Sequence, residues 1–281
     1  MFFKVIALDI DGTLTDSLKR ISAATKEHLL RFQQEGGTVI LASGRPVQGI
    51  RPYAEALELK KYGGYILAYN GGCVVDCRSG EVVFRDRLPA EYVPEICGII
   101  RGYPVGINTY EGDSLVVGQQ INRYTRITSR INGMPIHFVE DFAGYVNFDV
   151  NKCLLHGEPH VILQLEKILS EKYAGHLNIF KSEPFFLEIV PLGVDKAKSI
   201  DRLLRRLGIS RDECIACGDG FNDISMIRYA GLGVAMSNAA ESVKNAADYV
   251  TKSNDDDGIA YLLSRLSSQE TEPAVPQGRI G

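Results

Sequence analysis

The first third of the chain alternates between apolar runs and helix-like segments. Three β-branched, apolar runs have the length and composition of strands that are covered on both faces: residues 3–10, 38–42 and 64–69. Between them, apolar residues recur at helical spacing from Ser22, an expected N-cap, to Glu35, and again over residues 51–59. Strands that alternate with helices through short connections predict a parallel sheet with helices on both faces.

From about residue 82 the pattern changes. Two short strands, 105–110 and 115–117, flank the turn residues Glu111-Gly112-Asp113-Ser114, which is typical of a hairpin. The other elements expected here are helices at 89–101 and 159–173 and strands at 152–156, 176–180 and 185–189. Hairpins mixed with helices indicate a separate α+β domain.

After Pro191-Leu192-Gly193 the alternation of helix and strand returns. The expected helices are 196–207, 222–229, 239–246 and 258–266, and the expected strands are 214–217, 232–235 and 248–250. The pattern predicts an α/β fold, a doubly wound and mainly parallel sheet, with an α+β domain inserted into it. The core takes residues 1–81 and 188–266, the insertion 82–187, and residues 267–281 have the composition of a disordered tail.

Composition and charge narrow the class of protein. The 281 residues carry a formal net charge of −4, so neither nucleic acid nor an anionic membrane is an expected partner, although local positive groups can still hold a small anion. No apolar run approaches the roughly 18 residues of a membrane helix, and residues 2–10 lack a signal-peptide cleavage site. We expect a cytoplasmic protein, and the oligomeric state stays open.

The cysteines and histidines suggest no chemistry. The six cysteines are scattered, which favours reduced thiols over a disulfide framework. Cys214 and Cys217 are spaced like zinc ligands, but no second pair or suitably spaced histidines follow, so we interpret them as buried strand residues.

Polar residues follow the predicted strands at the points where they end. They are Asp9, Asp11, Ser43, Arg45, Asn70, Asp219, Asn222 and Asp223. Since ligands bind beyond the carboxyl ends of parallel strands, we expect these residues to share one edge. Gathered carboxylates repel one another unless a cation lies among them. A hard divalent ion with oxygen ligands is therefore implied, and Mg²⁺ favours phosphate partners.

The opening residues Asp9-Ile10-Asp11-Gly12 suit phosphoryl transfer. Asp9 ends a buried strand, so its carboxylate has a defined direction, and Gly12 permits a sharp turn that exposes amide groups to an anion. Asp11 faces the same crevice through the turn. One carboxylate can attack phosphorus while the other handles protons.

Four ordered motifs resemble those of the haloacid dehalogenase superfamily. They are Asp9-Ile10-Asp11-Gly12-Thr13-Leu14, Leu41-Ala42-Ser43-Gly44-Arg45-Pro46, Lys196, and Gly218-Asp219-Gly220-Phe221-Asn222-Asp223. The chain is similar in particular to the Cof-like sugar-phosphatase branch, whose large cap is inserted between the second and third motifs. The resemblance implies an Asp9 nucleophile that is also a metal ligand, with Asp11 as general acid and then base. The backbone carbonyl of Asp11 and the carboxylate of Asp219 would complete the protein's share of the Mg²⁺ shell.

The same resemblance implies roles for the remaining motif residues. Ser43 and Asn222, with backbone amides at Ile10 and Gly44, would hold phosphoryl oxygens. Lys196 would neutralise developing charge, Asp223 would orient Lys196 or a metal-bound water, and Gly12 and Thr13 would support the loop. Lys196 is preferred to Lys198 because it begins the helix. Arg45 and Asn70 are candidates for substrate contact, with an ordinary ion pair and an ordinary turn as the alternatives.

These residues together predict a Mg²⁺-dependent phosphatase that hydrolyses a small phosphorylated metabolite, such as a sugar or polyol phosphate, through an aspartyl-phosphate. An acid at position 11 favours this activity over dehalogenase chemistry. The alternatives are a phosphotransferase such as a mutase, or a non-catalytic metabolite-binding regulator. Specificity is expected on the cap face turned towards the core, where the candidates are Asn108, Tyr110, Arg123 and Phe185.

Overall fold

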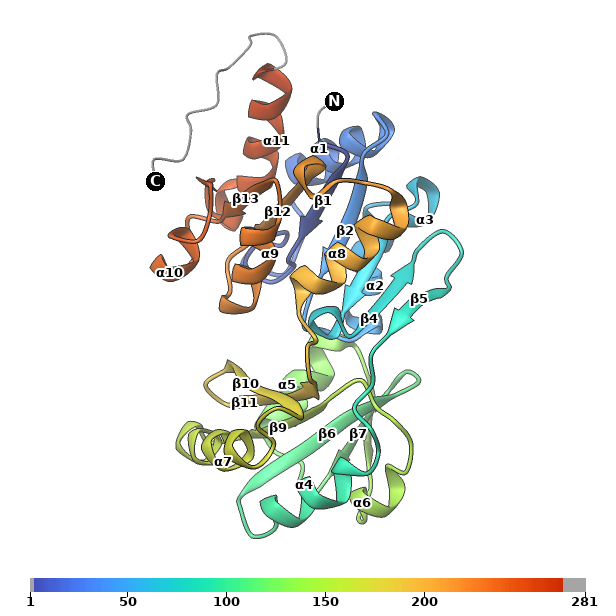
Figure 1. Cartoon of the computed structure of the whole chain (residues 1–281), viewed down its shortest axis with the longest axis vertical. Coiled ribbons are helices and arrows are strands. Elements are labelled where there is room, and N and C mark those ends of the chain that lie inside the picture. Colours follow the sequence, from blue (N-terminus) through green and yellow to red (C-terminus); the bar gives the residue numbers. More distant parts are fainter. Residues whose placement is uncertain (1–2, 270–281) are drawn as a thin grey trace.

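The computed structural model describes residues 3–269, which form two lobes joined by two chain segments (Figure 1). One lobe contains an eight-stranded sheet and the other a six-stranded sheet. The N-terminal and C-terminal parts of the chain build the larger lobe together, and the middle of the chain builds the smaller one (Figure 1).

The larger sheet has the order β14-β13-β12-β1-β2-β3-β4-β5. Its strands are β1 (Val5–Leu8), β2 (Thr38–Ala42), β3 (Tyr65–Ala68), β4 (Cys73–Asp76), β5 (Val82–Arg85), β12 (Cys214–Gly218), β13 (Leu232–Ala235) and β14 (Tyr249–Val250). The neighbouring strands β14, β13, β12, β1, β2 and β3 run parallel to one another. Strand β4 is antiparallel to β3, and β5 is antiparallel to β4. The predicted doubly wound, mainly parallel core is confirmed, and its order reverses between β1 and β12, where such sheets bind ligands.

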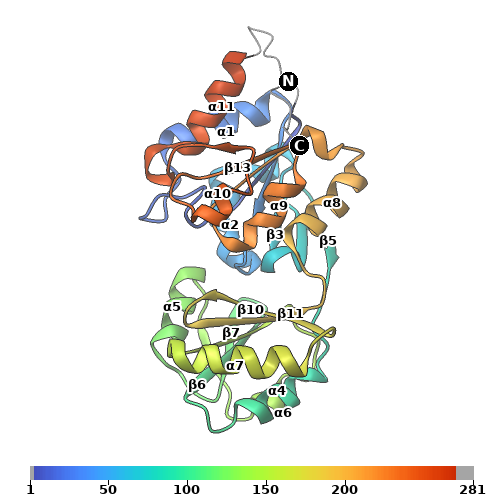
Figure 2. The same cartoon turned by 60° about the vertical axis from the view of Figure 1, so that its left-hand side comes forward.

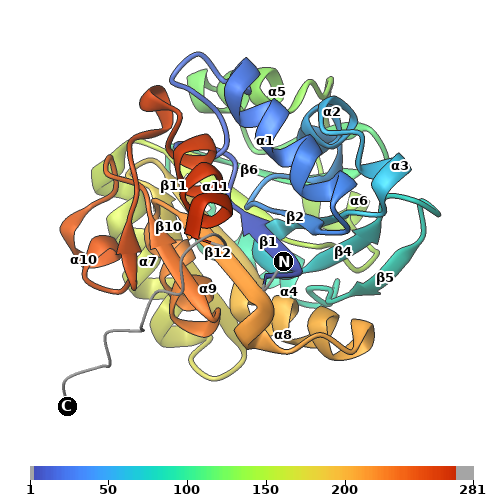
Figure 3. The ribbon, with the colours of Figure 1, turned by 90° about the horizontal axis from the view of Figure 1, so that it is seen from above.

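Helices cover both faces of this sheet because successive side chains of each strand point to opposite sides. Ile6 and Leu8 pack in one apolar core with α1 (Ala23–Gln34), α2 (Val47–Ala56) and α11 (Gly258–Gln269), and Val5 and Ala7 pack in another with α8 (Lys196–Leu207) and α9 (Ile224–Tyr229). Figure 3 shows α1 and α2 on one side of β1 and β2 and α8 on the other. The short helices α3 (Leu59–Tyr62) and α10 (Glu241–Lys244) complete the lobe.

The smaller sheet has the order β10-β11-β9-β6-β7-β8. Its strands are β6 (Val105–Glu111), β7 (Ser114–Gly118), β8 (Ile136–Phe138), β9 (Cys153–Gly157), β10 (Leu177–Glu183) and β11 (Phe186–Pro191), and its helices are α4 (Tyr92–Ile100), α5 (Arg123–Asn132), α6 (Phe142–Tyr145) and α7 (Pro159–Lys172). Helices α4, α6 and α7 lie on the far side of this sheet, so that its other face is turned towards the larger lobe (Figure 2).

Several local predictions differ from the structure. The strands β4 and β5 were not expected in the core, and β5 continues the eight-stranded sheet past residue 82, where we expected the insertion to begin. The helix expected at 51–59 begins at Val47, directly after Pro46 with its extended backbone. Helix α5 and strand β8 were not predicted. Helix α11 includes residues 267–269 of the expected tail, and the rest of that tail, 270–281, lies outside the described residues.

The N-cap predicted at Ser22 is confirmed, since its hydroxyl accepts a hydrogen bond from the Thr25 amide. None of the helices within residues 3–269 combines the length and hydropathy that a bilayer-spanning helix requires.

Candidate active site

A cavity of about 320 Å³ lies where the two lobes meet, at the carboxyl ends of the parallel strands. The core residues that line it include Asp9, Asp11, Ser43, Gly44, Arg45, Asp219, Asn222 and Asp223. The predicted convergence of the strand ends on one crevice therefore holds for the residues after β1, β2 and β12. The smaller lobe supplies the other wall, so the cavity is shared between lobes.

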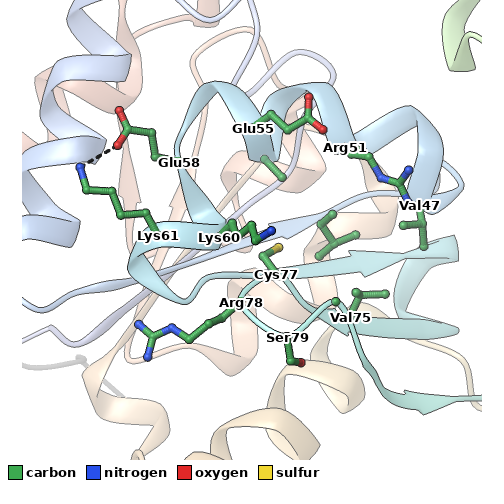
Figure 4. A pocket seen from close by; sticks show the side chains of 13 residues that line it. Val47, Arg51, Glu55, Glu58, Lys60, Lys61, Val75, Cys77, Arg78 and Ser79 are labelled. Atoms are coloured by element: carbon green, nitrogen blue, oxygen red, sulfur yellow. Dashed lines mark hydrogen bonds and ion pairs between the residues drawn. The ribbon is translucent and has the colours of Figure 1, made fainter.

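A larger cavity, of about 590 Å³, lies elsewhere on the core, between α2, α3 and the end of β4 (Figure 4). Its lining includes the apolar residues Ala54, Ile66 and Val75, and Figure 4 shows side chains of both charges around it, including Glu55 and Arg51. It shares no lining residue with the cavity between the lobes. Converging carboxylates, rather than cavity size, distinguish the candidate active site.

Lys196 is the centre of a buried cluster of charges. It begins α8, and its Nζ donates hydrogen bonds to Asp9 Oδ1 at 2.7 Å and Asp223 Oδ1 at 2.6 Å. Asp223 Oδ2 accepts from the backbone amides of Asp219 and Gly220. Both carboxylate oxygens of Asp223 are thus occupied by the protein, which fits an orienting role. Lys198, the alternative to Lys196, is exposed.

Burial and crowding perturb these carboxyl groups. Burial, together with the nearby charge of Asp223, raises the pKa of Asp9 well above its usual range although Lys196 opposes the shift. Burial would lower the pKa of Lys196, but Asp223 and Asp9 outweigh it and raise that pKa, so the lysine stays charged. One ammonium group therefore faces an excess of carboxylates.

Asp219 is positioned by residues of the first motif. Burial raises its pKa to about 6, although Thr13, whose hydroxyl donates to Asp219 Oδ1 at 2.7 Å, opposes the shift. Gly12 has a φ of +86°, and a side chain there would collide with the Asp219 carboxylate. Glycine at position 12 is therefore required twice, by the turn and by the close approach of Asp219.

The donor set fits a hard divalent ion. One carboxylate oxygen from each of Asp9, Asp219 and Asp223 lies within 4.8 Å of the others. Oxygen ligands at this spacing are those that Mg²⁺ prefers. Among residues 3–269 no other group of His, Cys, Asp or Glu side chains gathers in this way. Cys214 and Cys217 are buried within β12, as expected, and burial raises the pKa of Cys214 to about 12.

The Asp11 carboxylate is directed towards basic side chains. Arg45 donates to it twice, from Nε at 2.7 Å and Nη2 at 2.6 Å, and Lys19 Nζ lies 2.7 Å from Oδ1. Burial favours the neutral acid, but the hydrogen bonds and charges of Arg45 and Lys19 outweigh it and lower the pKa of Asp11. The ligand predicted from Asp11 is its backbone carbonyl, so this contact leaves that prediction open.

The second motif forms a tight loop beside these carboxylates. Ser43 is buried, and its hydroxyl accepts a hydrogen bond from the Arg45 amide. Asn222 donates from Nδ2 to Asn70 Oδ1 at 3.0 Å. Asn70, which has a φ of +56°, and Ile10 are both buried and are not among the residues that line the cavity. Arg45 also donates to the carbonyl of Ile131 in α5, which makes it a bridge between the lobes.

The wall from the smaller lobe includes Tyr110, Lys152 and Glu188. Of the four cap candidates, Tyr110 alone lines the cavity. Asn108 is buried beneath the surface, Arg123 pairs with Glu158 and Tyr124, and Phe185 stacks on Tyr124.

Lys152 and Glu188 were missed by the sequence reasoning. The signal for Glu188 was available, because it is the single charged residue in the otherwise apolar run 185–190.

Comparisons with known proteins agree with this geometry. The sequence model of the haloacid dehalogenase-like hydrolase family matches residues 6–263 of this chain. The chain is 30% identical over 260 residues to a 5-amino-6-(5-phospho-D-ribitylamino)uracil phosphatase, YcsE, of Bacillus subtilis, covering 92% of this chain and 94% of the relative.

Two solved structures are also similar. A haloacid dehalogenase-like hydrolase from Bacteroides thetaiotaomicron has a TM-score of 0.90 and 44% identity over 94% of this chain and 99% of that one. The HAD subclass IIB sugar phosphatase BT4131 has a TM-score of 0.82 and 30% identity over 94% and 99% of the two chains. The chain belongs to the haloacid dehalogenase-like hydrolases and is a phosphoric monoester hydrolase of that family.

Proposed function

We propose that the protein hydrolyses a small phosphorylated metabolite, a sugar or polyol phosphate, with Mg²⁺ and through an aspartyl-phosphate on Asp9. The observation that carries this proposal is the aimed carboxylate of Asp9 at the end of β1, held by Lys196 beside Asp219 and facing a cavity shared by both lobes. The sugar-phosphatase relative supports the substrate class.

In the first step, an Asp9 carboxylate oxygen attacks phosphorus, and the bond between phosphorus and the ester oxygen breaks. Asp11 gives its proton to the leaving alkoxide. In the second step Asp11 removes a proton from a water molecule that attacks phosphorus, which releases phosphate and restores Asp9. Lys196 balances the negative charge throughout.

The bound ion would be held by Asp9, Asp219 and the carbonyl of Asp11, and it would neutralise charge on the phosphoryl oxygens. Ser43, Asn222 and the amides of Ile10 and Gly44 would hold these oxygens in place. Thr13 holds the Asp219 carboxylate in position, and Asp223 holds Lys196 in position.

The ion pair of Asp11 with Arg45 sets a condition on this mechanism. A carboxyl whose pKa is lowered by Arg45 and Lys19 is a poor proton donor, so these contacts must loosen before Asp11 can act as an acid. Arg45 also contacts α5 of the smaller lobe, so movement of that lobe, the proposed cap, would provide the change.

The test is phosphate release from a panel of sugar, polyol and nucleotide monophosphates, with Mg²⁺ and with chelator. We expect metal-dependent release that Asp9→Asn lowers by several orders of magnitude, because a covalent nucleophile is lost. Isomerised product without phosphate would indicate a phosphotransferase, and binding without turnover would indicate a regulator. A variant that keeps a tenth of the wild-type rate would disprove the role of Asp9.

A further inference from the structure

The smaller lobe carries a buried ion pair on the cavity wall. Lys152, directly before β9, and Glu188, in β11, are each less than a tenth exposed, and Lys152 Nζ lies 2.7 Å from Glu188 Oε2. The alternation of β11 explains the placement, because Leu187 and Ile189 pack into the apolar core under the sheet while Glu188 faces the opposite way, into the cavity.

Stability alone is a weak explanation for this pair. Removing two charges from water is costly, and a buried pair is often no more stabilising than apolar residues of similar volume. The core beneath the sheet is already apolar. The charged pair lies on the face of the smaller sheet that meets the cavity. Its presence there is therefore better explained by the molecule that enters the cavity.

The pair also has bonding capacity left over. Lys152 donates to the backbone carbonyl of Gly44 at 2.9 Å and pairs with Glu188, and an ammonium group carries a third proton. Glu188 Oε1 accepts from the Ser182 hydroxyl, but Oε2 receives no well-directed hydrogen bond from any described residue. Lys152 thus has one proton to spare, and Glu188 Oε2, which is buried and contacts Lys152 Nζ, has acceptor capacity to spare; both residues line the cavity.

The position of the pair indicates which part of a substrate it meets. Gly44 belongs to the loop whose amide is expected to hold a phosphoryl oxygen, and Lys152 reaches that loop from the smaller lobe. Tyr110, whose ring centroid lies 5.7 Å from Lys152 Nζ, lines the same wall. The leaving group of a monoester bound at Asp9 would lie against this wall.

We propose, on the basis of the proposed function, that Lys152 and Glu188 determine specificity by binding hydroxyl groups of the leaving group. A hydroxyl donates to the carboxylate of Glu188 while a neighbouring hydroxyl oxygen accepts from Lys152. The pair is balanced in charge, so it matches a neutral polyhydroxylated group such as a sugar or polyol chain. An aryl phosphate without hydroxyl groups makes neither of these hydrogen bonds, so the spare bonding capacity of Lys152 and Glu188 stays unused and this substrate is disfavoured.

The experiment compares kcat/KM, with Mg²⁺, for glucose 6-phosphate and sorbitol 6-phosphate with that for p-nitrophenyl phosphate. In Glu188→Gln and Lys152→Met we expect the preference for the better polyhydroxylated substrate over the aryl phosphate to fall at least tenfold, mainly through its KM. Glu166→Gln is the matched control, because Glu166 pairs with Lys181 at 2.9 Å in the same lobe but does not line the cavity. Its preference is expected to match the wild type.

The outcomes separate this inference from the proposed function. If both variants lose activity on all substrates by the same factor, the pair only holds the lobes together and the inference is overturned, while the phosphatase stands. If the wild type releases phosphate from none of the three substrates, both are overturned. Thermal unfolding checks that each variant folds. If a single variant does not fold, the comparison is repeated with the double variant Lys152→Met/Glu188→Met, which buries no unpaired charge.

Discussion

The two lobes each hold a buried lysine near the candidate active site, and the surroundings of the two lysines differ. Lys196 in the core has two carboxylate partners, Asp9 and Asp223, with Asp219 close by. Lys152 in the smaller lobe has one, Glu188. The core cluster carries excess negative charge, which calls for a cation, whereas the second pair is balanced and suits neutral hydroxyl groups.

The two lysines also differ in how their contacts are assembled. Lys196 bonds residues that all belong to the core, at the end of β1 and in the loop after β12. Lys152 bonds Glu188 in its own lobe and Gly44 in the other. The first cluster is complete whenever the core is folded, but the second depends on how the lobes meet.

The strongest test of this difference is to remove each lysine in turn. In Lys196→Met the carboxylates of Asp9 and Asp223 lose their cation, so we expect kcat to fall by about 10²–10³ and the free energy of unfolding to fall by about 3–5 kcal/mol. Steady-state kinetics and denaturant unfolding measure both. The fall in kcat should exceed that of Lys152→Met at least tenfold, and equal losses would remove the distinction between the two centres.

The buried carboxyl groups of the core cluster should make the stability of the protein depend on pH. Burial raises the pKa of Asp219 from its ordinary value of 3.8 to about 6. Between these values the metal-free folded protein keeps a proton that the unfolded chain releases, so the free energy of unfolding falls as pH rises from about 4 to about 6. The fall due to Asp219 is about 3 kcal/mol.

Denaturant unfolding of the metal-free wild type and Asp219→Asn across this pH range measures the effect. The variant lacks the titrating carboxyl, so its decline should be shallower, and Mg²⁺ should flatten the wild-type curve because it favours ionised carboxylates. Parallel curves for the two proteins would show that Asp219 is not under electrostatic strain.

The smallest effect is expected from Thr13→Val, which keeps the shape of the side chain but removes the hydrogen bond to Asp219 Oδ1. Outer hydrogen bonds orient metal ligands, so we expect Mg²⁺ affinity to weaken about tenfold. Titration of Mg²⁺ followed by calorimetry measures the change. Thr109→Val serves as the control. The hydroxyl of Thr109 donates to the backbone carbonyl of Lys152, and both residues lie in the smaller lobe, whereas Thr13 and Asp219 lie in the core. Unchanged affinity in Thr13→Val would mean that Asp219 is held without Thr13.

Much of the core could be predicted because its signals are local. The runs that became β1, β2 and β12 are apolar and end in polar residues, so the pattern alone indicates a parallel sheet with its ligands at one edge. Strand β5 was missed because Val82-Val83-Phe84-Arg85 is short and half exposed, and only its pairing with β4 identifies it as part of the core.

By itself the sequence determined the fold class, and it predicted an inserted domain and the residues of the four motifs, since hydrophobic periodicity and ordered motifs are properties of neighbouring residues. The tertiary structure alone decided which charges pair within each lobe and which groups meet between the lobes. Asp11 meets Arg45 and Lys19, and Lys152 meets Glu188 and Gly44, between segments up to 108 residues apart. Such pairings depend on the registers of two sheets and on the way the lobes meet, which no local pattern encodes.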